Sequence, residues 1–198
     1  MERLVCLAIG YACGCVLCAE VVARLVAHRS IFEFGNGNPG MANTARSLGK
    51  GPAIACLLGD IGKVLVAAAV CHLLFPQLGM GVAGWAGLGA TLGHDAPFWH
   101  GFRGGKGVAT LSATIVLTSP LWSLLAVAAA ALSLLLTGYL SIAAVAASAA
   151  FALVMLALGT TDQALVALLS FALALWGQWS NLRGIRTGEA KRDLSRSR

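Results

Sequence analysis

Charged residues are scarce in this sequence. Asp, Glu, Lys and Arg together make up 11% of the 198 residues, whereas 58% are hydrophobic, and the mean hydropathy is +0.81. A soluble domain has about 25% charged and about 45–50% apolar residues. The shortage of charge therefore excludes an ordinary soluble domain and indicates an all-α polytopic membrane protein.

Aromatic residues are also few, at 7%, whereas glycine is abundant, with 24 residues. Small residues allow membrane helices to pack backbone against backbone. No linker divides the chain, so we predict one integral membrane domain at residues 1–182 and a basic tail at residues 183–198.

Residues for a metal site are missing too. The six cysteines lie inside apolar runs, where a thiol packs as a small hydrophobic side chain. Cys15 and Cys18 form a Cys-x-x-Cys pair, but no second pair or histidine cluster accompanies them, as a zinc site requires. We therefore expect neither a metal nor a cofactor.

The apolar segments predict a seven-helix bundle. Two of them, at about 79–93 and 108–118, are short for a full crossing and are predicted as half-length helices packed inside the bundle. The five long segments are residues 4–27, 52–75, 121–137, 139–158 and 163–180. The sequence contains no inverted pair of broken helices of the kind that many transporters have.

The basic residues predict the orientation. Lys and Arg gather at residues 29–50, at 103–106 and in the tail, and the positive-inside rule places such segments in the cytoplasm. The N-terminus is then outside and the C-terminus cytoplasmic. The turn near Gly138 is also cytoplasmic in this arrangement, although it carries no basic residue. A basic tail beside a span is a topology signal, so we expect no nucleic-acid partner.

A first polar cluster, "GNGNPGMANTARSLGK", covers residues 35–50. Its opening matches the dinucleotide-binding pattern G-x-G-x-x-G, but a membrane helix and no strand precedes it, which excludes that interpretation. Glycines can still form a nest of N–H groups for an anion. Asn36, Asn38 and Asn43 add neutral donors, and Arg46 adds a planar fork that suits phosphate. The alternative is an ordinary turn between helices.

A second cluster, "GHDAPFWHGFRGGKGVAT", covers residues 93–110. It is not a Walker A loop, because Gly107 follows Lys106 where Ser or Thr should hold magnesium. Lys106, the glycine amides and the N-terminus of the predicted helix would together attract an anion. His94 and His100 are candidate acid–base groups. The alternatives are a basic interfacial anchor and, for the histidines, hydrogen bonding or packing.

Two charged residues within the second span form another candidate functional site. Asp60 and Lys63 are three residues apart and therefore share one helix face. Ionisable groups at that depth usually serve a function, and a structural ion pair is the alternative. A third cluster, "QWSNLRGIRTGEAKR", contains Asn181 among basic residues. The alternative is a basic segment that only marks the end of the last span. Three such clusters at one face indicate a phosphorylated substrate that meets a membrane lipid.

The stretches "GNGNPGMANTAR", "LGK", "DIGK", "GHDAPFWHGFRGGKGVAT" and "NLRGIRTGE" resemble, in order and spacing, the bacterial acyl-phosphate-dependent glycerol-3-phosphate acyltransferases, the PlsY family. The resemblance implies a seven-helix fold in the bacterial cytoplasmic membrane. It also implies transfer of a fatty acyl group from acyl phosphate to the 1-hydroxyl of glycerol 3-phosphate at the cytoplasmic face. The products would be lysophosphatidate and phosphate.

The same resemblance implies roles for individual residues. The implied catalytic residues are Asn36, Arg46, Lys106 and His94. The implied substrate- and phosphate-binding residues are Gly37, Asn38, Gly40, Asn43, Asp60, Lys63, Gly104, Gly105, Gly107, Thr110 and Asn181, with Pro39 shaping the pocket.

Several positions depart from the family pattern. The family usually has Ser where this chain has Asn36, and His and Arg where it has Gln178 and Trp179. Gly184 stands where the family has Arg, and "GCVL" replaces a turn similar to "GSIP". We therefore expect a divergent acyltransferase. The alternatives are a paralogue with a different acceptor and a non-catalytic lipid-phosphate-binding membrane protein. A transporter is disfavoured because the charges cluster at one face.

Overall fold

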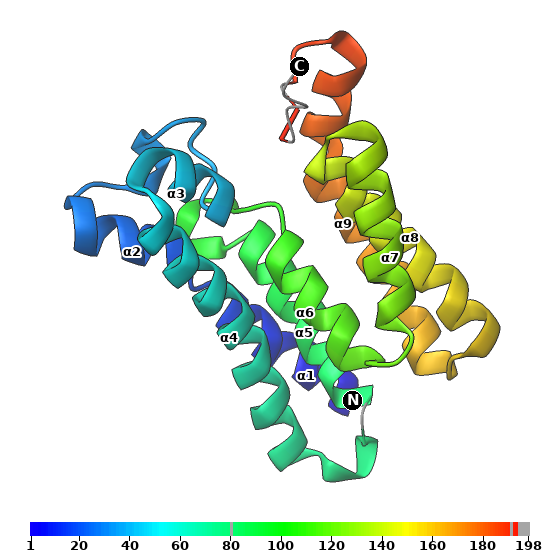
Figure 1. The fold of residues 1–198 in the computed structure, drawn as a ribbon. Helices are drawn as coiled ribbons and strands as arrows, with labels where there is room; N and C mark the ends of the chain where they lie inside the picture. The colour runs from blue at the N-terminus through cyan, green and yellow to red at the C-terminus, as the bar shows by residue number, and fades with distance from the viewer. Residues whose placement is uncertain (80, 191, 194–198) are drawn as a thin grey trace. The chain divides into compact units, whose positions relative to one another are not determined.

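The computed structural model describes residues 1–79, 81–190 and 192–193, and every regular element in this part of the chain is helical (Figure 1). The α-helices are α1 (Glu2–Gly14), α2 (Cys18–Ala27), α3 (Met41–Leu48), α4 (Lys50–Leu74), α5 (Gly81–Asp95), α6 (Val108–Thr118), α7 (Ser123–Thr137), α8 (Leu140–Leu158) and α9 (Thr161–Thr187). Short 3₁₀ turns are η1 (Ile31–Glu33), η2 (Pro76–Leu78) and η3 (Phe98–His100). The predicted all-α class is confirmed.

The chain forms two compact units, Met1–Thr114 and Ile115–Arg198. Among the described residues, four helical stretches are long and apolar enough to cross a membrane, namely Glu2–Ala27, α4, α8 and α9. The helices α5 and α6 are short, as expected, with 15 and 11 residues. The segment 121–137 gives α7, which has 15 residues because a turn at Pro120 precedes it and its first residue, Ser123, hydrogen-bonds back to the Pro120 carbonyl at 2.7 Å.

The first unit is built around very close packing of α1 against α5 (Figure 1). A Cβ added at Gly10 or Gly14 would collide with the backbone of Ala86 or Ala90 on α5. On the facing helix, a Cβ at Gly89 or Gly93 would likewise collide with the backbone of α1. Each helix therefore presents glycines spaced by four residues, the small-residue arrangement that lets membrane helices meet backbone to backbone. The prediction from glycine content is confirmed here.

The first span is interrupted between α1 and α2, at the "GCVL" segment where the resembled family has a turn, although hydropathy predicts one continuous span at residues 4–27. The break frees the carbonyl groups of Gly14, Cys15 and Val16, and each one accepts a hydrogen bond from a side chain. Lys63 Nζ donates to the carbonyls of Gly14, at 3.1 Å, and Val16, at 3.0 Å. Trp99 Nε1 donates to the Cys15 carbonyl at 3.0 Å. Backbone at membrane depth must have all its polar groups paired, so these two side chains make the break tolerable.

In the second unit, the start of the C-terminal tail returns to the turn between α7 and α8. The Asp193 amide donates to the Gly138 carbonyl at 2.8 Å, and Asp193 Oδ2 accepts from the Leu140 amide at 3.0 Å. The Arg192 guanidinium lies 6.0 Å from the centre of the Tyr139 ring. The boundary that we place after residue 182 falls inside α9, which continues to Thr187. Residues 191 and 194–198 of the predicted tail lie outside the described residues.

Candidate active site

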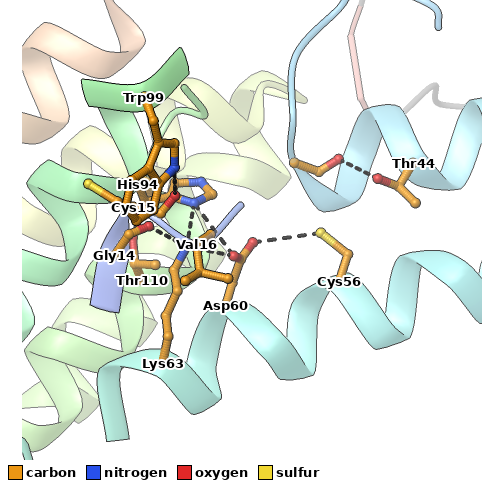
Figure 2. Close-up of polar contacts among 12 residues, drawn as sticks. Gly14, Cys15, Val16, Thr44, Cys56, Asp60, Lys63, His94, Trp99 and Thr110 are labelled. Atoms are coloured by element: carbon orange, nitrogen blue, oxygen red, sulfur yellow. Dashed lines mark hydrogen bonds and ion pairs between the residues drawn. The ribbon is translucent and has the colours of Figure 1, made fainter. Parts of the chain in front are cut away.

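A buried ion pair on α4 lies at the centre of the candidate site. Asp60 and Lys63 share one face of the helix, as their spacing predicts, and Lys63 Nζ lies 2.9 Å from Asp60 Oδ1. The two side chains are only 3% and 6% exposed. The Cys56 thiol, one turn earlier, donates to Asp60 Oδ2 at 3.7 Å (Figure 2). Burial of two charges in a membrane protein requires such pairing.

Lys63 also connects α4 to the end of α5. Its Nζ lies 2.8 Å from His94 Nδ1, while the same ring nitrogen is 3.5 Å from Asp60 Oδ1 (Figure 2). His94 is buried, with 4% of its surface exposed. One ammonium group therefore contacts Asp60, His94 and the broken end of α1, so three separate segments are fixed at a single point.

The glycine–lysine loop, residues 104–107, lies directly on His94 and Asp95. The Gly105 amide donates to the His94 carbonyl at 2.9 Å. A Cβ at Gly105 would collide with the His94 ring at Nε2, and a Cβ at Gly104 would collide with the His94 carbonyl. Gly107 has a φ of +64° and lies over the Asp95 carboxylate. Glycine is therefore required along this loop by contact with α5, in addition to any contact with a ligand.

Helix α6 begins immediately after this loop. The Leu111 amide donates to the Gly107 carbonyl at 2.7 Å, and Thr110 Oγ1 donates to the same carbonyl at 3.1 Å. The predicted juxtaposition of Lys106, the glycine loop and a helix N-terminus is therefore present in the structure. Because the first amides of a helix have no partner within it and the helix dipole is positive there, this position attracts anions.

The first motif forms a turn that is held by the side chain of Asn43. Asn43 Oδ1 accepts from the Asn36 amide at 3.3 Å, and Asn43 Nδ2 donates to the Phe34 carbonyl at 3.0 Å. Asn36 is exposed, and its Oδ1 accepts from the Asn38 amide at 3.1 Å. Gly37 lies in the left-handed region, with a φ of +70°. The Asn43 amide thus shapes the turn from within.

The motif continues into α3, a helix that the sequence did not predict. Gly40 is its N-cap residue, and the Gly40 carbonyl accepts from Thr44 Oγ1 at 3.1 Å. Arg46 lies exposed in the last turn of this helix. The helix packs on α4, so the first motif and the charged pair belong to the same unit.

Two further contacts, which no sequence pattern predicts, hold the loops. Glu20, 5% exposed on α2, accepts from the Ile31 amide at 2.8 Å and from Ser30 Oγ at 2.9 Å, and so ties η1 to α2. The rings of Phe32 in η1 and His100 in η3 lie 5.6 Å apart. The turn before the first motif and the loop of the second motif are therefore in contact, although Phe32 and His100 lie far apart in the sequence.

The third motif belongs to the second unit. Gln178, 2% exposed, lies on α9 and its Oε1 accepts from Asn181 Nδ2 at 2.9 Å. The first unit thus contains every other predicted site residue, from Asn36 to Thr110.

Comparison with known proteins agrees with this arrangement. Residues 4–188 match the family model of glycerol-3-phosphate acyltransferase. A glycerol-3-phosphate acyltransferase of Methylorubrum populi is 40% identical over 185 residues, which cover 92% of this chain and 88% of that protein. The match confirms the family resemblance carried by the motifs.

Two crystal structures of PlsY (YgiH), an integral membrane glycerol 3-phosphate acyltransferase, share the fold at 28% sequence identity. The glycerol 3-phosphate form has a TM-score of 0.83 and covers 97% of this chain and 96% of that chain. The lysophosphatidic acid form has a TM-score of 0.81 and covers 97% and 95%. The chain therefore belongs to the glycerol-3-phosphate acyltransferase family of integral membrane proteins.

Proposed function

We propose that this protein transfers a fatty acyl group from acyl phosphate to the 1-hydroxyl of glycerol 3-phosphate. The hydroxyl oxygen forms a bond to the acyl carbonyl carbon, the bond from that carbon to the phosphate oxygen breaks, and the hydroxyl proton passes to a phosphate oxygen. The products are lysophosphatidate and inorganic phosphate. The family to which the chain belongs acts on glycerol 3-phosphate. PlsY has been crystallised in a glycerol 3-phosphate form and in a lysophosphatidic acid form.

One observation supports the proposal above all. The loop Gly104–Gly107 runs into the N-terminus of α6 and is seated on His94, whose ring contacts the buried Lys63. A loop of glycines with a lysine at a helix N-terminus is a site for phosphate, and its rigid support suits catalysis by positioning. Acyl phosphate is already activated, so orientation and charge neutralisation supply most of the rate.

The residues divide into groups by the part of the reaction they serve. Lys106, with the amides of Gly104 and Gly107, holds one phosphate next to Thr110, while the Gly105 amide donates to the His94 carbonyl and so seats the loop on α5. Arg46 and the turn of Gly37, Asn38 and Gly40 hold the second phosphate, with Asn36 at the turn and Asn43 shaping it. Asp60 and Lys63 support His94. The substrate-binding role that the resemblance implies for Asn181 stays a prediction.

The membrane lipid supplies the environment of the acyl chain. The C-terminal tail and the basic loops lie on the cytoplasmic side, and the N-terminus lies outside, in the cytoplasmic membrane of a bacterium. The positive-inside rule supports this orientation, because Lys and Arg gather at residues 29–50, at 103–106 and in the tail.

A second candidate keeps the site but changes the chemistry. Asn36 and Gln178 are neutral amides, and the Gln178 amide is engaged with Asn181, so a paralogue that accepts a different hydroxyl, or that binds lipid phosphates without turnover, would have the same fold. This candidate is favoured only if the standard substrates fail.

The test uses purified protein in lipid vesicles with acyl phosphate and glycerol 3-phosphate. We expect lysophosphatidate formation matched by phosphate release, and loss of both in Lys106→Ala. Turnover no higher than in Lys106→Ala would contradict the proposal for this substrate pair. Binding of glycerol 3-phosphate without turnover would then support the non-catalytic candidate, and turnover of another acceptor would support the paralogue.

A further inference from the structure

We propose that Lys63 fixes the proton of His94 on Nε2, so that His94 is a hydrogen-bond donor to the phosphoryl group at the glycine–lysine loop and not a general base. The inference rests on the proposed function, because it assigns a role to His94 at that phosphate. Lys63 and Asp60 are then positioning residues, which act through His94 and through the break in the first span.

A neutral His94 carries its proton on one of its two ring nitrogens, Nδ1 or Nε2. An ammonium group has three donors and no acceptor. Lys63 Nζ lies 2.8 Å from His94 Nδ1, and both residues are buried. A hydrogen bond at this distance therefore runs from Lys63 to an unprotonated Nδ1. In a neutral imidazole the single proton must then lie on Nε2.

The second step concerns the charge of Lys63. Its Nζ is 2.9 Å from Asp60 Oδ1 and also donates to the carbonyls of Gly14 and Val16. All four neighbours of Nζ are hydrogen-bond acceptors, an environment that suits the ammonium form. The proton of the hydrogen bond to His94 therefore stays on Lys63.

The third step concerns where Nε2 points. A Cβ placed on Gly105 would meet His94 Nε2 before any other atom, so this edge of the ring faces the glycine–lysine loop. Figure 2 shows the other edge of the ring, at Nδ1, joined to Lys63 by a dashed line. The Nε2–H group thus joins Lys106 and the N-terminus of α6 as a donor beside the anion site.

These steps remove His94 from the list of general bases. A base at this position needs a lone pair on Nε2, but Nε2 carries the proton for as long as Lys63 occupies Nδ1. The charged groups near the ring are Lys63 and Asp60 from α4 and Asp95 from α5 itself. Asp60 and Lys63 form a pair of zero net charge. A donor aimed at a developing negative charge lowers the barrier without proton transfer.

The first experiment observes the tautomer directly by ¹⁵N NMR of histidine-labelled protein in detergent micelles. The sequence contains only four histidines, so the signals lost in His94→Gln assign His94. We expect a protonated Nε2 and an unprotonated Nδ1 for His94 at neutral pH, without any substrate. A protonated Nδ1, or a doubly protonated ring, would overturn the inference whatever the enzymatic activity is.

The second experiment uses a matched pair of variants. The amide oxygen of His94→Asn can still accept from Lys63, but the side chain has no group at the position of Nε2. His94→Gln is longer and places an amide donor near that position, and neither amide can act as a base. We expect kcat/KM to fall by about 10- to 100-fold in His94→Asn, the range for a lost hydrogen bond to a charged group. His94→Gln should retain at least about tenfold more activity than His94→Asn.

The pH profile completes the test. We expect wild type and His94→Gln to have the same profile of kcat/KM between about pH 6 and pH 8, the range in which a free histidine titrates. Equal losses in the two variants, or an inflection of the wild type that disappears in His94→Gln, would show a base and overturn the inference. An inactive wild type would instead contradict the proposed function, and the NMR result would still decide the tautomer.

Discussion

Removal of Lys63 should destabilise the protein strongly, and simultaneous removal of Asp60 should restore part of the loss. In Lys63→Met, the Asp60 carboxylate keeps its buried position, 3% exposed, but loses the ammonium at 2.9 Å. Breaking a buried pair by removing one partner costs about 3–5 kcal/mol, because the remaining charge is left without compensation. A loss of about 3 kcal/mol corresponds to roughly a 100-fold shift in the unfolding equilibrium.

The double variant Asp60→Leu with Lys63→Met removes both charges. Its remaining cost comes from the carbonyls of Gly14 and Val16 and from His94 Nδ1, which lose the hydrogen bonds of 3.1, 3.0 and 2.8 Å from Lys63. Each such loss costs about 1 kcal/mol, so the double variant should lose about 3 kcal/mol, a cost that Lys63→Met also bears in addition to the uncompensated charge of Asp60. We therefore expect the double variant to be more stable than Lys63→Met alone.

The assay is unfolding in mixed detergent micelles, followed by circular dichroism, for the two single variants, the double variant and wild type. Leu58→Ala is the control on the same helix, because Leu58 is 63% exposed to the surroundings and should change stability little. If the losses of the two single variants simply add in the double variant, Asp60 and Lys63 do not interact and the reasoning is refuted.

Three further outcomes follow from the same contacts. In Gly105→Ala the new Cβ displaces the His94 ring, so kcat/KM should fall at least about tenfold, beyond the cost of one lost hydrogen bond. Gly51→Ala is the control, because a Cβ there meets open space and should leave kcat/KM unchanged; similar activities of the two variants would contradict the contact. Asn43→Ala leaves the Asn36 amide and the Phe34 carbonyl unpaired and should lower the free energy of unfolding by about 2 kcal/mol. Asn36→Ser keeps an acceptor for the Asn38 amide and should be close to neutral in the same unfolding assay; equal losses in the two variants would argue against the observed turn. Asp193→Ala removes the carboxylate that accepts from the Leu140 amide, so this amide should exchange its hydrogen faster by mass spectrometry, and unchanged exchange would show that the carboxylate does not hold the turn.

The parts of the site that follow from local chemistry could be predicted from the sequence. The spacing of Asp60 and Lys63 places them on one helix face whatever the rest of the fold is, and the structure confirms the pair. The position of Lys106 before a helix N-terminus followed from glycines that directly precede an apolar run, and α6 begins at Val108. Both features depend on a few neighbouring residues, so long-range packing does not alter them.

The break in the first span could not be predicted in the same way. Residues 15–17 read "CVL", which is as apolar as the helices on either side. What stabilises the break is a hydrogen bond from Trp99 and two from Lys63, residues 84 and 47 or more positions away. Hydropathy registers only the side chains of the segment itself, whereas the partners of the freed carbonyls come from α4 and η3.

The helix α3 was missed for a related reason. Its sequence, "MANTARSL", is only eight residues long and contains Asn and Thr, which usually favour turns and caps. In the structure these residues are the buried ones: Asn43 reaches back to the preceding turn, and Thr44 bonds to the Gly40 carbonyl. Polar residues that pair with nearby backbone are difficult to tell from loop residues before the loop is placed.

Asn36 and Gln178, the two positions that depart from the family motifs, have similar contacts in the structure. Asn36 stands where the family has a serine and Gln178 where it has a histidine, and each amide oxygen accepts a hydrogen bond from a neighbour, the Asn38 amide in one case and Asn181 in the other. Each substitution therefore keeps an acceptor that orders its motif but removes a group that can exchange a proton. If Lys63 also holds the His94 proton on Nε2, none of these three side chains can take the proton of the attacking hydroxyl. The reaction that this chain can still support is one in which a substrate phosphate accepts that proton, while the protein contributes donors, charge and orientation.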